Sequence, residues 1–172
     1  MLALIEAFMK IALRRVGPED LPDSPLLLAL AAAAYVGLQA VAAVPVFGSF
    51  SAAVVRSVVA DTVLLAGCAW LLLRALGFPA RYRQTLTALF GTGALLTVFV
   101  LPAYLWARAT GSAEGAGFLP SLAILVVLVW SVAANGHILA RALSTGFPLG
   151  VALALCYLLL NFVLVSQLGQ PA

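Results

Sequence analysis

Long runs of apolar residues, separated by short stretches rich in Gly, Pro and Ser, fill the chain after residue 24. A bilayer core about 30 Å thick requires roughly 20 apolar residues at about 1.5 Å rise each. Pro25 follows Asp23 and Ser24, which are residue types that cap the start of a helix. The pattern predicts five membrane-spanning helices, over about residues 25–47, 52–76, 84–107, 119–143 and 148–168.

The first 16 residues follow a different pattern. Glu6, Lys10 and Arg14 recur every four residues and so share one side of a helix. Apolar residues fall toward the other side: Leu2, Ile5, Phe8, Met9 and Leu13. Because this run is too short to span a bilayer, it predicts an interfacial amphipathic helix over residues 1–16. An acidic, proline-containing linker over 17–24 and a tail over 169–172 complete the predicted organisation.

The composition excludes whole classes of protein. Hydrophobic residues make up 65% of the chain and charged residues 9%, against roughly 45–50% and about 25% in soluble domains. The nine Lys and Arg residues form no dense basic face, so nucleic acid is not an expected partner. The expected fold is therefore an all-α integral membrane protein, with a bundle of five transmembrane helices and an N-terminal interfacial helix.

The basic residues predict an orientation, because cytoplasmic loops carry an excess of Lys and Arg. If the N-terminus is cytoplasmic, only Arg56 and Arg108 lie on the opposite side of the membrane. We therefore expect a cytoplasmic N-terminus and, after five spans, a C-terminus on the other side. Seven cytoplasmic residues are candidates for contact with anionic lipid or a partner: Lys10, Arg14, Arg15, Arg81, Arg83, His137 and Arg141.

Asp61 is the one acidic residue near the middle of a predicted span. Placing a charged group there costs about 2.5–3.5 kcal/mol on insertion scales, so such residues are functional candidates. Counting the helical rise puts Thr97 and Asn161 at a comparable depth, and Ser57 lies one turn earlier. This polar cluster is interpreted either as a proton- or ion-coupled site or as a hydrogen-bond network that holds helices together. Tyr157, four residues before Asn161, is expected to share a helix–helix polar contact with it.

No catalytic or cofactor signature is present in the sequence. His137 has no second ligand at metal-binding spacing, and Cys68 and Cys156 are expected to pack as small hydrophobic residues. We therefore expect no enzyme activity, no cofactor and no metal. Gly91 and Gly93 remove side-chain bulk from the third span and should let neighbouring helices approach closely.

Two stretches resemble the Yip family of small membrane proteins. Residues 81–89 (RYRQTLTAL) are similar to the family's entry into its third span. Residues 129–148, with Trp130, His137 and Arg141 before the turn STGFP, are similar to its fourth span and final turn. The resemblance implies a five-helix Yip-type bundle. Eukaryotic members are adaptors that bind small GTPases and one another, but this sequence lacks their long polar N-terminal region, so no functional residue is carried over.

Two functions are therefore expected. The first is a non-enzymatic Yip-like scaffold or assembly protein that contacts the lipid bilayer and a membrane-protein partner or further copies of itself. The alternative is a small proton- or ion-coupled transporter or channel in which Asp61 is the working group.

Overall fold

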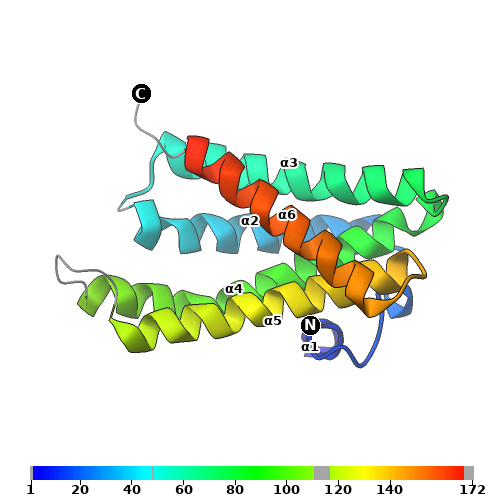
Figure 1. The fold of residues 1–172 in the computed structure, drawn as a ribbon, viewed down its shortest axis with the longest axis horizontal. Helices are drawn as coiled ribbons and strands as arrows, with labels where there is room; N and C mark the ends of the chain where they lie inside the picture. Colours follow the sequence, from blue (N-terminus) through cyan, green and yellow to red (C-terminus); the bar gives the residue numbers. More distant parts are fainter. Residues whose placement is uncertain (1, 48, 111–116, 169–172) are drawn as a thin grey trace.

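The computed structural model describes residues 2–47, 49–110 and 117–168, and Figure 1 traces them as helices joined by short turns. The predicted tail, 169–172, lies outside the described residues. The elements are α1 (Leu2–Ala12), η1 (Pro18–Asp20), α2 (Pro25–Phe47), α3 (Ala52–Ala75), η2 (Pro79–Arg81), α4 (Tyr82–Thr110), α5 (Phe118–Ala142) and α6 (Phe147–Leu168).

Among the described residues five helices, α2 to α6, are long and apolar enough to cross a membrane, which agrees with the five long apolar helices that the sequence predicts. Their bounds differ from the predicted ones by at most three residues. They run back and forth along the long axis of the molecule (Figure 1). The predicted cap at the start of α2 is present, since Ser24 Oγ accepts a hydrogen bond of 3.3 Å from the backbone N–H of Leu27.

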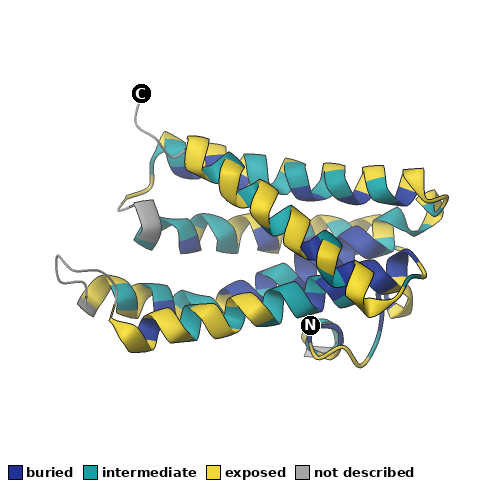
Figure 2. Cartoon of the chain, viewed as in Figure 1, coloured by how far each residue is buried: buried dark blue, intermediate teal, exposed yellow. Residues whose placement is uncertain are grey.

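Helix α4 forms the centre of the bundle. It packs against α1, α2 and α5. Of the residues in its most apolar stretch 61% are buried, compared with 11% in the corresponding stretch of α6. Exposed residues cover the outer faces of the long helices, whereas buried residues gather around α4 (Figure 2). Many exposed residues are large and apolar, for example Leu71, Val129 and Phe162. Such a surface is suited to hydrocarbon rather than water.

Helices α5 and α6 approach each other closely at a pair of glycines. A Cβ atom added at Gly150 would lie 2.1 Å from the carbonyl oxygen of Gly136 and 2.8 Å from Ala140 Cβ. Only a residue without a side chain fits between the two backbones here. This contact fixes α6 against the end of α5 and so helps to set the position of the residues farther along α6.

Helix α1 lies across the long helices and is seen almost end-on in Figure 1. Ile11 is fully buried and Ala12 is almost so, whereas Ile5 and Leu13 remain about half exposed. The face that packs on α4 and α5 is therefore rotated from the predicted apolar side. The reason is that α1 has apolar residues on two adjoining sides, and the bundle covers only the one that contains Ile11.

Candidate functional site

The carboxylate of Asp61, in α3, is held by donors from two other helices. The Tyr35 hydroxyl of α2 donates to Oδ2 at 2.5 Å. On α6, the Tyr157 hydroxyl donates to Oδ1 at 2.6 Å, and Asn161 Nδ2 donates to the same oxygen. The acidic group thus joins α2, α3 and α6 inside the apolar part of the bundle.

Two further side chains extend the network to α4. Gln39 Nε2 donates to the Tyr35 hydroxyl at 3.2 Å, and Gln39 Oε1 accepts from the Thr97 hydroxyl at 3.4 Å. Thr97 also shares its hydroxyl with the carbonyl of Gly93, one turn earlier, at 2.9 Å. Tyr35 and Gln39 lie one turn apart on the same face of α2. This face therefore connects Asp61 to Thr97 of α4 through two successive side chains.

Asp61 lies in the walls of two cavities. The larger, about 330 Å³, extends between α3, α4, α5 and α6, and the smaller, about 240 Å³, extends toward the opposite end of the bundle from α1. Both cavities share four lining residues: Gln39, Asp61, Tyr104 and Asn161. The larger cavity adds the polar side chains of Thr97, Ser131 and Asn135. The carboxylate therefore faces two cavities whose walls combine hydroxyl and amide groups with apolar side chains.

The structure brings together part of the predicted cluster. Asn161 contacts Asp61 directly, and Thr97 is connected to it through Gln39 and Tyr35. Ser57 is separate, because its hydroxyl donates to the Val54 carbonyl of its own helix at 2.9 Å, although it lines the smaller cavity.

Sequence reasoning missed two members of the network, Tyr35 and Gln39. Their spacing of four residues in an otherwise apolar span is the signal that marks them. Tyr157 and Asn161 were predicted to share a helix–helix contact. In the structure Asn161 Nδ2 lies 3.4 Å from the Tyr157 hydroxyl, and the contact that both make between helices is with Asp61.

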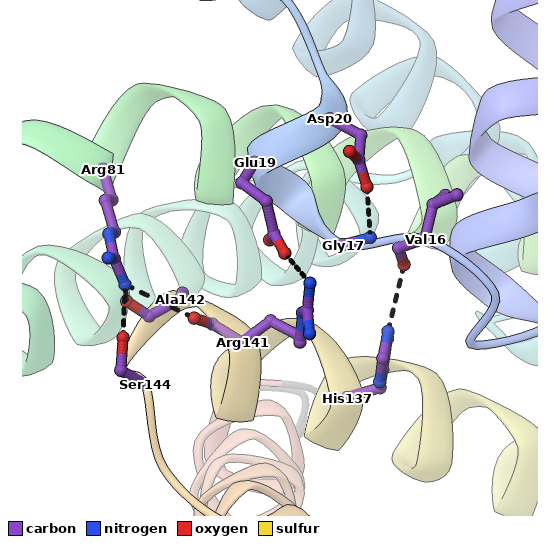
Figure 3. A network of polar contacts seen from close by, with 9 residues as sticks. All are labelled: Val16, Gly17, Glu19, Asp20, Arg81, His137, Arg141, Ala142 and Ser144. Carbon is purple, nitrogen blue, oxygen red and sulfur yellow. Dashed lines mark hydrogen bonds and ion pairs between the residues drawn. The ribbon is translucent and has the colours of Figure 1, made fainter.

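Three side chains of α5 contact the N-terminal segment, residues 12–19. Trp130 Nε1 donates to the carbonyl of Ala12 at 2.8 Å, and His137 Nε2 lies 3.0 Å from the carbonyl of Val16. Since a carbonyl only accepts, Nε2 carries the proton of this bond. One turn farther on, Arg141 pairs with Glu19. Figure 3 shows the side chains of His137 and Arg141 pointing toward the segment.

The remaining candidate basic residues occupy varied environments. Arg81 bonds to the end of α5, and Arg83 lies 3.3 Å from Asp23 Oδ1. The Lys10 ammonium lies 2.8 Å from Glu6 Oε1, and the Arg14 guanidinium stacks over the ring of Phe147 at 5.2 Å. Arg15 is exposed. Most of these basic residues therefore have a charged, polar or aromatic partner within the chain.

Among the described residues no group of three His, Cys, Asp or Glu side chains is placed to hold a metal ion. Comparisons with known proteins return no family model, no curated protein and no solved structure that matches this chain.

Proposed function

We propose that this multi-pass membrane protein moves a proton or a small cation across the membrane through Asp61. The observation that carries the proposal is the position of the carboxylate in the shared wall of two cavities with mixed polar and apolar lining, within a helix apolar enough to span a bilayer. Ionisable residues inside spans are rare and face cavities or pathways when they serve transport.

The groups around Asp61 suit such exchange. A carboxylate accepts a proton or binds a cation directly, and a tyrosine hydroxyl both donates and accepts hydrogen bonds. When a proton or cation reaches Asp61, the hydroxyls of Tyr35 and Tyr157 can turn their protons away and offer oxygen instead. Gln39 Nε2 donates to the Tyr35 hydroxyl at 3.2 Å and keeps that oxygen hydrogen-bonded in either orientation of its proton.

Flux measurements on purified protein in liposomes test the proposal. An imposed proton or sodium gradient should dissipate faster with the protein than without it, and Asp61→Asn should abolish the difference. Asn keeps the size of Asp and two polar atoms but removes the charge. Ser57→Ala is the matched control, because Ser57 lines the same cavity without touching Asp61. Absence of flux for a folded wild-type protein, or unchanged flux in Asp61→Asn, would falsify the transport proposal.

The orientation in the membrane belongs to the same proposal. The N-terminus is placed in the cytoplasm and, after five spans, the C-terminus on the opposite side, with the α1 helix resting at the cytoplasmic interface. The distribution of basic residues supports this orientation. Reporter fusions that are active on only one side of the membrane should give opposite results at the two ends. A cytoplasmic signal from both ends would contradict an odd number of spans.

A Yip-like assembly role is the second proposal. It is favoured by one observation: Tyr35, Tyr157 and Asn161 together supply three donors to Asp61, an arrangement that also ties helices together. The basic loop gives it less support, because Arg81 and Arg83 both bond within the chain. This role requires a membrane partner that copurifies with the protein and is lost on Arg81→Ala/Arg83→Ala or on removal of residues 1–16. Retention of the partner by both variants would contradict it.

A further inference from the structure

A polar cavity of about 440 Å³ lies at the end of the bundle where α4 begins and α5 ends. It is separate from the cavities at Asp61, with which it shares no lining residue. Its polar lining comes from η1, η2, α4, the end of α5 and the turn that follows: Glu19, Arg81, Gln84, Thr85, Arg141, Ser144 and Thr145. Two guanidinium groups and one carboxylate leave this lining with a net positive charge.

Arg81 is held firmly at one side of this cavity. Its Nη1 donates to the Ala142 carbonyl at 3.0 Å and to the Ser144 hydroxyl at 2.7 Å (Figure 3). The guanidinium stacks on the ring of Phe78 at 4.7 Å. All of these bonds use one nitrogen, so the donors on Nη2 and Nε remain for another acceptor. Arg81 is therefore a positioned cation with hydrogen-bonding capacity left over.

Arg141 is on the other side of the cavity and pairs with Glu19, as Figure 3 shows. Both side chains are about half exposed, at 55% and 43%. Ion pairs this exposed contribute little to stability, so another anion can replace the Glu19 carboxylate at small cost. The backbone around Glu19 need not move, because His137 and Gln84 bind the carbonyls of Val16 and Leu21 on either side.

The wall of the cavity also contains an unused polar group. The Thr145 hydroxyl is buried and has no hydrogen-bond partner among the described residues. Buried hydroxyls are nearly always bonded, so the Thr145 hydroxyl has a hydrogen bond still to make in the wall of this cavity. A tetrahedral oxyanion offers acceptors in several directions at once, which fits a hydroxyl and two guanidiniums around one space.

We propose that this cavity binds a phosphate group, with Arg81 and Arg141 as its main ligands and Glu19 as the internal carboxylate that it displaces. Arginine forks match phosphate geometry and form charge-assisted bonds with it. The phosphate belongs either to a free anion or to a lipid headgroup, and both present the same oxygens to the cavity. The proposal does not depend on transport at Asp61.

Displacement of Glu19 predicts opposite effects from two charge-removing substitutions. Glu19→Gln removes the competing carboxylate and should raise phosphate affinity by about threefold, because exposed ion pairs are weak. Arg141→Gln removes a charged ligand and should lower the affinity by about tenfold or more. A merely structural role for the pair predicts that both substitutions weaken binding alike.

Binding is measured on the full chain in detergent by calorimetric titration with inorganic phosphate at constant ionic strength. A second titration uses nanodiscs of phosphatidylcholine with and without phosphatidic acid, and follows the thermal stability of the protein. Arg74→Gln is the matched control, since it removes the same charge from the last turn of α3, at a residue that stacks on Trp70 and does not line the cavity.

Each outcome decides the proposal. Binding of inorganic phosphate, with the two opposite effects and an unchanged Arg74→Gln control, supports a site for free phosphate. The same pattern with phosphatidic acid alone supports a headgroup as the source. Failure of both probes, or equal behaviour of Glu19→Gln, Arg141→Gln and Arg74→Gln, overturns the proposal.

Discussion

The ring of Phe8 in α1 lies directly against Gly91 in α4, so closely that a Cβ atom at Gly91 would come within 2.2 Å of Phe8 Cε1. This contact, together with the bond from Trp130 to the Ala12 carbonyl, fastens α1 across the bundle. Gly91, which the sequence predicts to allow the close approach of another helix, is approached by α1. The missing side chain at Gly91 therefore helps to set the position of α1 on α4.

Gly91→Val should release α1 from the bundle, because the new side chain occupies the space of the Phe8 ring. Overpacking of this kind costs about 1–3 kcal/mol. Limited proteolysis of the purified protein should show faster cleavage near residues 13–16 in the variant. Gly67→Val is the control, since nothing lies within 4 Å of a Cβ at Gly67. Equal cleavage of both variants would show that Phe8 does not hold α1 in place.

Tyr35→Phe and Tyr157→Phe should each destabilise the bundle by about 1.5–3 kcal/mol, the range for hydrogen bonds to charged groups. Each change removes only the hydroxyl that donates to Asp61. Unfolding in a denaturing detergent, followed by circular dichroism, measures the loss. Tyr104→Phe makes the same chemical change in a residue that lines both cavities without a bond to Asp61. The interpretation fails if Tyr104→Phe is as destabilising as the other two.

Gly150→Ala should be strongly destabilising for a single added methyl group. The Cβ atom would overlap the Gly136 carbonyl at 2.1 Å, and a backbone cannot yield as a flexible side chain does. The expected cost is about 1–3 kcal/mol, measured by the same unfolding assay. Gly37→Ala, in α2, provides the comparison because its Cβ meets nothing within 4 Å. A Gly150→Ala protein as stable as Gly37→Ala would mean that α5 and α6 are farther apart.

The Glu6–Lys10 pair should make α1 sensitive to acid. The hydrogen bond and charge of Lys10 hold the pKa of Glu6 below its ordinary value of 4.5. Because the folded pKa is the lower one, the pair stabilises α1 above pH 4.5 and loses its effect as pH falls through the lowered pKa. NMR titration of the Glu6 carboxyl carbon gives the pKa, which should return toward 4.5 in Lys10→Gln and stay low in Lys10→Arg. Identical pKa values in all three proteins would refute the coupling.

The candidate site was predictable in part. The depths of Asp61 and Asn161 follow from counting residues along each helix, and the structure joins these two side chains. The part played by Tyr35 does not follow from counting residues, because α2 is apolar on nearly every side and only the spacing of Tyr35 and Gln39 marks the face that turns inward. Ser57 lines the smaller cavity with Asp61 but does not bond to it, since a serine within a helix can satisfy its hydroxyl on its own backbone.

The long helices of the described residues, and their bounds to within three residues, follow from the sequence alone, because the length of an apolar run and the Gly and Pro residues at its ends act locally. The rotation of each helix about its axis follows only from the packing of the bundle, and with it the contact of Tyr35, Tyr157 and Asn161 with Asp61. The packing also decided that α5 binds the N-terminal segment through Trp130. The physical reason is that apolar helices pack by shape, and fits such as that of Phe8 against Gly91 exist only once the helices are assembled.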